Sequence, residues 1–553
     1  MTPDNYYIAD QFSLLSKLMD IHGENSFKTK SYSIAAFTIE KLPDQLSALP
    51  SEKIFGIKGI GPNIGKKIIN ILESGELDVL KEYIRKTPPG VIEMLNIKGL
   101  GPKKIATVWK EMEIESIGEL VYACNENRLL LYKGFGEKTQ NNIRDTIEFY
   151  LKNQGSHLYA EIENFTLRLD QKLKENFPEQ SFSLAGEWRR QLEIINQLEW
   201  VTTADSISLQ SFFAKNAFAV LNADENKIVF RGSENIAICF WLSDRNTYFG
   251  RLFQHSASEE FLQSWQNSVN GREMIGFASE EEIFSSHNIH FIPPFLREKT
   301  PVIEQAQKSD LPNVIHTKDI KSIIHSHSTW SDGSNTVEAM ALACIEKGFE
   351  YMVISDHSKS AFYANGLSEE RIREQHNYIN ELNGKLAPFR VFKSIECDIL
   401  NDGNLDYSDN ILSTFDLVIT SIHSNLKMTE EKAMMRLIRA IENPHTTILG
   451  HMTGRLILSR PGYPVDHKKI IDACAANKVV IELNAHPRRL DIDWRWIDYA
   501  LERGVMISID PDAHSVEGFD DIKYGVLVAQ KAGVTSRNNL SSFTLKEFEE
   551  FIK

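Results

Sequence analysis

Residues 316–553 alternate short apolar runs with longer segments in which apolar residues recur at three-to-four spacing. The apolar runs fit β-strands, and the longer segments fit amphipathic helices. The seven expected strands are KSIIHSHS, YMVISDHS, RVFKSIECDI, DLVITSIHS, TILGHM, VVIELNA and VMISIDPDAH. Helices are expected between them at 334–349, 368–384, 429–444 and 465–478, several opening with a Ser, Thr or Asp cap. This alternation predicts a parallel α/β sheet or barrel.

Three segments near the N-terminus repeat one order: apolar, Lys, Gly, apolar, Gly, then a polar helix start. They are IKGIGPNIGKKI (57–68), IKGLGPKKIATV (97–108) and YKGFGEKTQNNI (132–143). The glycines permit a tight turn, and the following helix start offers unpaired N–H groups and a positive dipole end to phosphate. One such turn is often a mere connection between packed helices, whereas three copies with a shared lysine indicate binding to the DNA backbone. The expected DNA-binding residues are Gly59, Gly61, Lys66, Lys67, Gly99, Gly101, Lys103, Lys104, Gly134 and Gly136.

Six of the seven expected C-terminal strands end at or near a His, Asp or Glu. In a β/α barrel these ends meet at one mouth, and His325 and His327 would face the same side of a strand. A lone histidine is usually a surface residue or a core residue with its hydrogen bonds satisfied. A histidine at the end of each of five strands would rarely arise by chance. Imidazole mixed with carboxylate suits Zn²⁺, Mn²⁺ or Fe²⁺ better than Mg²⁺. The candidate metal ligands and catalytic residues are His325, His327, Asp332, His357, Glu396, His423, His451, Asp512 and His514.

Length and composition bound the remaining possibilities. A chain of 553 residues is expected to form three or four domains. Its net charge is −15, yet residues 1–155 carry 20 basic and 20 acidic side chains, so the excess acid lies further on. Five isolated cysteines without a CxxC pair favour reduced thiols in a cytoplasm. We expect no membrane span and no leader peptide, because no apolar run approaches the ~20 residues required and the N-terminus lacks a basic, apolar segment.

The C-terminal motifs resemble the PHP (polymerase and histidinol phosphatase) domain that bacterial family X DNA polymerases carry. HSHSTWSDG, SDHS, IECDI, SIHS, GHMTGRL, ELNAHPRRLD and DPDAH follow one another as in that family. All nine metal positions hold suitable ligands, while Met452 stands where the family usually has proline. The resemblance implies a (β/α)7-type barrel with about three divalent ions (Mn, Zn or Fe). Relatives use it as a Mn²⁺-dependent 3′–5′ exonuclease, and some cut at abasic sites or trim blocked 3′ ends.

The resemblance extends over nearly the whole chain and implies a multidomain protein with α+β and α/β parts. The implied domains are a small helical domain with the first helix-hairpin-helix (1–85), a second hairpin domain (86–155), a polymerase palm (156–243), a thumb (244–315) and the PHP domain (316–553).

The palm resembles the family's in outline but lacks its catalytic carboxylates. The family's G-S-x-R-R turn, which holds a triphosphate, is GEWRR here, with an acid at the serine position. The family's Asp-x-Asp strand and third Asp are replaced by Gln, Glu and Cys, and two Mg²⁺ ions need carboxylate oxygens. We therefore expect no catalytic Mg²⁺ in the palm. The residues of this degenerate polymerase site are Glu187, Arg189, Arg190, Gln197, Glu199 and Cys239.

The resemblance also implies that the first domain could have lyase activity. In lyase-competent relatives, a lysine after the first hairpin forms a Schiff base with an abasic sugar. Lys67 stands at about that position, with Lys28 and Tyr32 as candidate phosphate contacts. Alternatively, Lys67 is one solvated lysine among several.

The expected function is that of a DNA repair enzyme of the bacterial cytoplasm, associated with the nucleoid. It would bind gapped, nicked or 3′-ended duplex DNA through the backbone and hydrolyse phosphodiesters from the 3′ end. The alternatives are a working polymerase of base excision repair, a non-catalytic DNA-binding protein with structural metals, and a phosphatase of small phosphomonoesters. Arg455, Arg488 and Lys359 are candidate phosphate contacts, among which the sequence does not choose. The sequence indicates no protein partner.

Overall fold

The computed structural model describes residues 3–125, 128–152, 155–216, 218–232, 234–269, 274–308, 311–458 and 461–553. The chain divides into two compact units, residues 1–154 and 155–553. No helix in these described ranges is long and apolar enough to cross a membrane.

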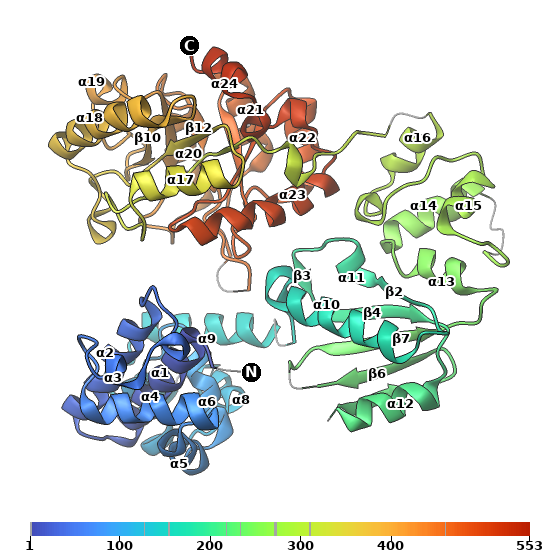
Figure 1. Cartoon of the computed structure of the whole chain (residues 1–553), viewed down its shortest axis with the longest axis horizontal. Coiled ribbons are helices and arrows are strands. Elements are labelled where there is room, and N and C mark those ends of the chain that lie inside the picture. The colour runs from blue at the N-terminus through green and yellow to red at the C-terminus, as the bar shows by residue number, and fades with distance from the viewer. Residues whose placement is uncertain are drawn as a thin grey trace. The chain divides into compact units, whose positions relative to one another are not determined.

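The N-terminal unit is helical and is drawn in blue to cyan in Figure 1. Its α-helices are α1 (Asn5–His22), α2 (Ser26–Glu40), α3 (Ser51–Ile54), α4 (Pro62–Ser74), α5 (Asp78–Lys86), α6 (Pro89–Glu93), α7 (Pro102–Lys110), α8 (Ile117–Asn125) and α9 (Glu137–Lys152). Helix α1 packs against α2, α5 and α7 through a continuous apolar core that includes Phe12, Leu15 and Met19. The predicted helical character of this part is confirmed.

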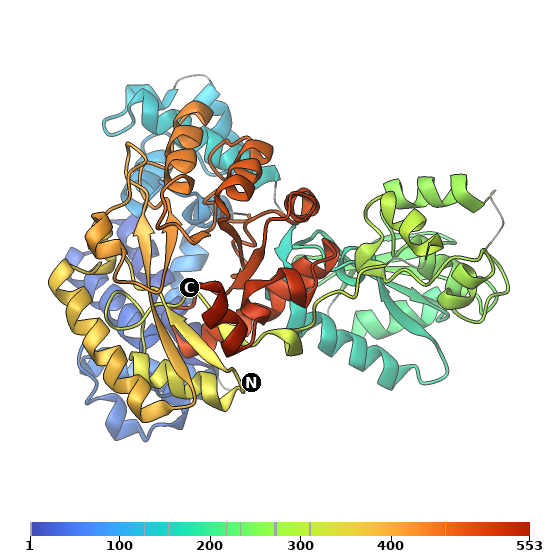
Figure 2. The same ribbon diagram turned by 90° about the horizontal axis from the view of Figure 1, so that it is seen from above.

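The first part of the C-terminal unit is a mixed sheet with helices, drawn in teal to green in Figure 2. Its elements are β1 (His157–Leu158), α10 (Tyr159–Asn176), β2 (Phe182–Ala185), α11 (Gly186–Arg189), β3 (Ile194–Ile195), β4 (Gln197–Thr202), α12 (Ser206–Lys215), β5 (Ala219–Ala223), β6 (Lys227–Arg231) and β7 (Ala237–Leu242). The main sheet has the order β2-β4-β7-β6-β5, and β4 runs parallel to β7. This pairing sets Glu199 beside Cys239, so two of the expected polymerase positions are neighbours across the sheet.

A small helical segment follows the sheet. It contains α13 (Tyr248–Gln254), α14 (Glu259–Val269), α15 (Glu280–Ser285) and α16 (Pro301–Gln307). Aromatic side chains fill its core, with Phe253, Trp265 and Phe284 in mutual contact.

The last part of the chain forms a nearly closed barrel of seven parallel strands, which confirms the predicted fold class. The strands are β8 (Ser322–Ile323), β9 (Tyr351–Ile354), β10 (Arg390–Asp398), β11 (Leu417–Ser421), β12 (Ile448–Leu449), β13 (Val480–Asn484) and β14 (Ile507–Asp510). They lie side by side in chain order, and a bridge from Ser326 to Ala513 links the first strand's end to the last. Strands buried on both faces account for the continuous apolar runs in the sequence.

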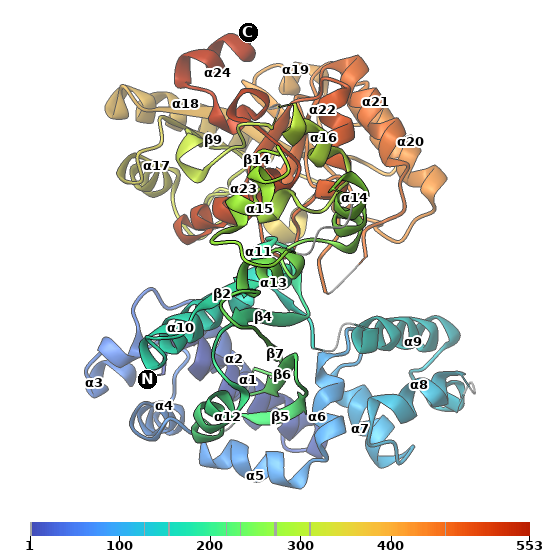
Figure 3. The same ribbon diagram turned by 90° about the vertical axis from the view of Figure 1, so that its right-hand side faces the viewer.

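Helices flank the barrel strands on the outside (Figure 3). They are α17 (Val337–Glu346), α18 (Glu369–Leu386), α19 (Asp409–Leu412), α20 (Glu430–Ile441), α21 (His467–Asn477), α22 (Ile497–Glu502), α23 (Ile522–Lys531) and α24 (Leu545–Phe551). Thr336, Ser368 and Thr429 cap α17, α18 and α20, because each side-chain oxygen accepts a backbone N–H of the first turn. The expected starts at 368 and 429 are therefore confirmed, whereas α17, expected from residue 334, is capped by Thr336 and begins at Val337.

Charged side chains join the palm-like sheet region to the barrel within the C-terminal unit. Glu161 of α10 pairs with Arg488 at 2.8 Å, and Glu163 pairs with Lys523 at 2.6 Å. Deeper in, Glu193 accepts from Arg495 at 2.9 Å and from the indole of Trp494 at 3.2 Å. The barrel is thus held to the region before it by specific ion pairs.

Candidate metal centre and DNA-binding hairpins

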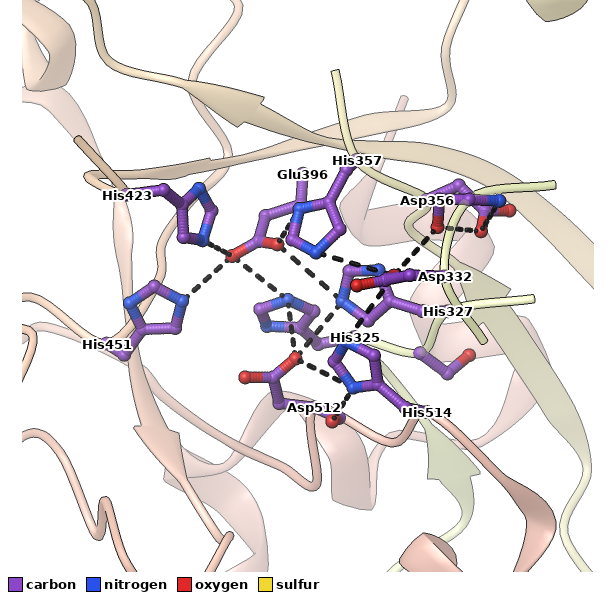
Figure 4. Close-up of polar contacts among 12 residues, drawn as sticks. His325, His327, Asp332, Asp356, His357, Glu396, His423, His451, Asp512 and His514 are labelled. Carbon is purple, nitrogen blue, oxygen red and sulfur yellow. Dashed lines mark hydrogen bonds and ion pairs between the residues drawn. The ribbon is translucent and has the colours of Figure 1, made fainter. Parts of the chain in front are cut away.

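The structure brings all nine candidate ligands together at the C-terminal ends of the barrel strands (Figure 4). His325, His327 and Asp332 follow β8, His357 follows β9, Glu396 lies in β10, His423 follows β11, His451 follows β12, and Asp512 and His514 follow β14. Three groups have ligand atoms within 4.8 Å of one another: His327, Asp332, His357 and His514; His325, His327, Glu396 and Asp512; and His357, Glu396 and His423. The ninth residue, His451, joins them through Glu396 at 2.8 Å.

Glu396 lies at the centre of this cluster. One carboxylate oxygen is 3.1 Å from His423 Nε2 and 3.3 Å from His325 Nε2, and the other is 3.0 Å from His357 Nδ1. The side chain is fully buried on a strand interior. A carboxylate surrounded by imidazoles in this way would offer oxygen donors to divalent cations that the same histidines could bind.

The two histidines of the HSHS motif reach the site for a different reason from the predicted one. Strand β8 ends at Ile323, and His325 has φ +59°, outside the extended conformation. The alternation of side chains along a strand therefore does not explain their common direction. Asp512 also has a positive φ, +52°, and such backbone conformations in non-glycine residues concentrate at functional sites.

The residues present fit divalent cations. Within the described part of the chain, five buried atoms of the cluster make no hydrogen bond: His325 Nε2, His327 Nδ1, His357 Nδ1, Glu396 Oε2 and His451 Nδ1. Buried polar atoms are normally satisfied, so this concentration of atoms without a well-aligned hydrogen bond is consistent with cations bound among them. Imidazole and carboxylate lone pairs are the donors that Zn²⁺, Mn²⁺ and Fe²⁺ accept. The donor set indicates divalent metal binding.

The charges of the cluster are strongly coupled. Burial opposes the charged form of Glu396, but His423, His325 and His357 hold its pKa well below the usual range. Burial would likewise lower the pKa of His423, but Glu396 and Asp398 raise it to about 10. The pKa of His514 is raised to about 9 against burial, mainly by its hydrogen bond to Asp332. The neighbouring carboxylates thus favour the protonated forms of His423 and His514, and of His325, whose pKa is raised well above its ordinary value.

Metal binding is expected to release protons and to tighten as pH rises. Because the pKa values of His423 and His514 lie near 10 and 9, a metal ion must displace a proton from each at pH 7. We expect apparent Mn²⁺ affinity to increase from about pH 6 to about pH 9. Calorimetric titration in two buffers of different ionisation enthalpy measures the released protons. Affinity that stays constant over this range, without proton release, would contradict these ligand assignments.

A second layer of carboxylates orients the histidines, and the sequence analysis missed it. Glu482, fully buried on β13, accepts from His325 Nδ1 and from the backbone N–H of His451, the latter at 2.5 Å. Asp398 accepts from His423 Nδ1 at 3.1 Å. Such carboxylates fix the tautomer and direction of a ligand histidine. In the sequence, Glu482 is visible as an acidic residue within the apolar run VVIELNA, which is the feature that could have identified it.

Asp356 orders the loop that carries Asp332. Its carboxylate accepts the backbone N–H and hydroxyl of Ser328, the hydroxyl of Ser331 at 2.6 Å and the amide of Gln375 at 2.6 Å. Figure 4 shows Asp356 beside the ligand cluster. Asp356 directly precedes His357 in the SDHS motif, and this position could have identified it as a supporting residue.

The three glycine turns share one backbone geometry. Gly59, Gly99 and Gly134 have φ values of +96°, +88° and +95°, which glycine alone adopts easily. Gly61 and Gly101 are extended, precede a proline at the first helical position, and leave α4 and α7 without a side-chain cap. Uncapped helix starts with an open approach are suited to phosphate oxygens.

The lysines of the hairpins differ in exposure. Lys66 and Lys103 are exposed, whereas Lys67 and Lys104 are half-buried. Among the candidate lyase-site residues, Lys28 is exposed and paired with Glu24, but Tyr32 is buried in the core against Phe12.

Acidic substitutions at the two extended glycines are expected to weaken DNA binding. A Cβ at Gly61 or Gly101 meets no atom within 4 Å, so Gly61→Glu and Gly101→Glu add negative charge without strain. We expect the double variant to bind duplex DNA about tenfold or more weakly, with a salt slope smaller by about one per lost phosphate contact. Gly118→Glu, at an equally open position on α8, is the matched control. Equal affinities of the double variant and control would show that the hairpins are only connections.

In the palm-like region, residues at the expected polymerase positions make internal contacts. Glu187 accepts the backbone N–H of Asn196 at 2.6 Å and its side-chain amide at 2.8 Å. Glu199 accepts the indole N–H of Trp241 at 2.7 Å, and burial raises the pKa of its carboxyl. Burial raises the pKa of the Cys239 thiol to about 12.

The two arginines of the GEWRR turn are also engaged. Arg189 pairs with Glu280 and donates to Ser256 at 2.8 Å. Arg190 donates to Glu298 at 2.8 Å, and Glu298 also pairs with Lys531 of the barrel at 3.1 Å. Within the described ranges, no three His, Cys, Asp or Glu side chains of residues 155–308 lie close enough to hold an ion.

The fold and its centre together define the class of the protein. A parallel barrel with imidazole and carboxylate ligands gathered at its strand ends is the architecture of a metal-dependent hydrolase. Residues 3–77 match the family model described as a helix-hairpin-helix domain, and residues 91–148 match a SAM-like helix-hairpin-helix tandem. Both glycine-turn regions are therefore confirmed as helix-hairpin-helix domains, a DNA-binding type.

Relatives extend the assignment to the whole chain. It is 32% identical to the DNA polymerase/3′-5′ exonuclease PolX of Bacillus subtilis (strain 168) over 559 aligned positions, which cover 97% of each protein. A probable phosphatase of Thermoanaerobacter sp. (strain X514) is 25% identical over 240 residues, 41% of this chain and 93% of that protein. A probable phosphatase of Syntrophotalea carbinolica is 26% identical over 169 residues, 29% of this chain and 64% of that protein. The chain belongs to the PolX family.

Proposed function

We propose that this protein is a metal-dependent DNA phosphodiesterase that removes nucleotides from 3′ ends and so processes DNA for repair. The observation that carries this proposal is the convergence of nine ligand side chains on one barrel mouth. The hairpins of the N-terminal unit bind the DNA backbone of gapped, nicked or 3′-ended duplexes without sequence preference. The exonuclease activity in the name of the B. subtilis relative supports the reaction.

The chain's own residues prepare the site for hydrolysis. Divalent ions bound there, about three by the number of ligand groups, would activate water and neutralise charge on the phosphate. The nine candidate ligands would hold the ions, while Glu482, Asp398 and Asp356 orient the histidines and the loop that carries Asp332. We expect Mn²⁺ or Zn²⁺, with Fe²⁺ also compatible with this donor set.

The palm has no catalytic part in this proposal. One amide, one half-buried acid and one buried thiol, at the positions Gln197, Glu199 and Cys239, cannot form oxygen cages for two Mg²⁺ ions. We assign the palm and thumb a supporting role, consistent with the ion pairs between Glu161, Glu193 or Glu298 and the barrel. Schiff-base chemistry at Lys67 stays a prediction from the sequence.

The cellular setting follows from substrate and thiol chemistry. All five cysteines are unpaired and buried, as in a reducing compartment. We place the protein in the bacterial cytoplasm, at the nucleoid.

A comparison of substrate classes tests the proposed reaction. The full-length protein, loaded with Mn²⁺, is incubated with a 3′-recessed duplex labelled at either end and with 4-nitrophenyl phosphate. We expect release of the 3′-terminal label as mononucleotide, progressive shortening of 5′-labelled strands, and little monoester hydrolysis. Monoester turnover without DNA shortening would instead make the barrel a phosphatase.

A further inference from the structure

Three cations near the barrel mouth already have partners. Arg455 donates to the carbonyl of Arg489 at 2.8 Å, to Asp493 at 2.6 Å and to the carbonyl of Leu490. It therefore binds the chain segment after β13 rather than a ligand. Lys359 lies 3.9 Å from Glu369.

The third cation, Arg488, is directed towards the palm-like region. Its guanidinium donates to Glu161 of α10 at 2.8 Å, and its side chain is half exposed. Of the candidate phosphate contacts from the sequence, Arg455 and Arg488 are thus engaged elsewhere, whereas Lys359 makes only a long surface pair with Glu369.

Arg489, which the sequence analysis did not consider, faces the metal ligands. Its Nε lies 3.5 Å from Asp512 Oδ2, and its side chain is 21% exposed. That distance is too long for a strong hydrogen bond. Asp512 is already oriented by others, since Oδ2 accepts from the Asn484 amide at 3.2 Å and Oδ1 lies 3.1 Å from His327 Nε2. In the described part of the chain, no other acceptor contacts the Arg489 guanidinium.

The segment that carries Arg489 is firmly held. The backbone N–H of Arg489 donates to His486 at 2.7 Å, and its carbonyl is held by Arg455. The segment also returns to β13, where Asn484 donates to the carbonyl of Asp491 at 2.7 Å. A guanidinium on so constrained a backbone is pre-organised at the mouth of the site.

We propose that Arg489 is a phosphate-binding residue of the nuclease site. Its terminal N–H groups would donate to the non-bridging oxygens of a nucleic acid phosphodiester that lies against the ions beside Asp512. The planar guanidinium group can donate two parallel hydrogen bonds to two oxygens of one phosphate. Asp512 does not need such a donor, because other side chains already orient it. The inference rests on the proposed function, because it assumes that the barrel binds phosphodiesters.

The experiment compares Arg489→Gln and Arg489→Lys with Arg488→Gln, the matched control on the adjacent residue. Three quantities are measured on full-length protein: bound Mn²⁺, the affinity of the Mn²⁺-loaded protein for inorganic phosphate by calorimetry, and KM and kcat on a 3′-recessed duplex. A hydrogen bond to a charged group corresponds to roughly a 10–100-fold effect. We expect Arg489→Gln to keep its Mn²⁺, to bind phosphate about tenfold or more weakly and to show a raised KM. Arg489→Lys should restore part of the affinity, and Arg488→Gln, which loses only the pair with Glu161, should bind Mn²⁺ and inorganic phosphate as the parent does.

Two results would overturn the assignment. Unchanged phosphate affinity in Arg489→Gln would show that the residue makes no phosphate contact. Loss of Mn²⁺ from Arg489→Gln would make it a positioning residue for Asp512. DNA hydrolysis by the parent protein tests the proposed function. The phosphate titration tests the role of Arg489 independently, because it compares parent and variant whether or not the parent hydrolyses DNA.

Discussion

Glu396→Gln is expected to abolish 3′–5′ DNA degradation and to lose bound metal. The carboxylate lies within 3.3 Å of His325, His423 and His451, so no other side chain can replace its central position. We expect a rate loss greater than the roughly 10–100-fold that removal of an outer-layer partner costs. Metal content is measured by elemental analysis, and activity by release of a labelled 3′-terminal nucleotide.

DNA binding separates loss of chemistry from loss of structure in this variant. Because the hairpins lie in the other compact unit, Glu396→Gln should bind duplex DNA with the parent's affinity. Glu381→Gln, an exposed position on α18, is the matched control and should retain full activity. Glu396→Gln protein that kept both metal and nuclease rate would refute the central role of this carboxylate.

Template-directed nucleotide addition is expected to be absent with either Mg²⁺ or Mn²⁺. The expected carboxylate positions hold a neutral amide, a half-buried acid that accepts from Trp241, and a thiol with a pKa of about 12. Glu187 stands at the serine position of the turn that holds a triphosphate in the family, and its carboxylate already accepts from Asn196. Extension of a labelled primer on gapped and primed templates measures the activity.

Glu199→Ala provides the internal control for the palm. If palm and barrel act independently, this variant should degrade DNA at the parent's rate and still add no nucleotides. Extension by the parent that disappears in Glu199→Ala would show a working polymerase with unusual ligands.

Much of the barrel could be predicted because chemistry and periodicity coincide there. Parallel strands buried on both faces give apolar runs, and ligands at their ends are visible as interruptions by His, Asp or Glu. The direction of His325 could not be derived, since it depends on a positive φ rather than on strand alternation.

The supporting residues were harder to predict because their partners are distant in sequence. Glu482 contacts His325 across 157 positions, and Arg190 meets Glu298 across 108. Neither pairing has a local signature, because the closeness arises only when the barrel closes or the helical segment packs on the sheet. Arg489 was overlooked for the same reason, since only its distance from Asp512 distinguishes it from Arg488.

We propose that this PolX-family protein keeps its metal chemistry in the barrel and has none in the palm. Diffraction from crystals soaked in Mn²⁺, measured at the manganese absorption edge, tests both the presence of metal in the barrel and its absence from the palm. The account predicts anomalous peaks among His325, Glu396 and Asp512 and none beside Glu199. A peak at Glu199 with none in the barrel would contradict it.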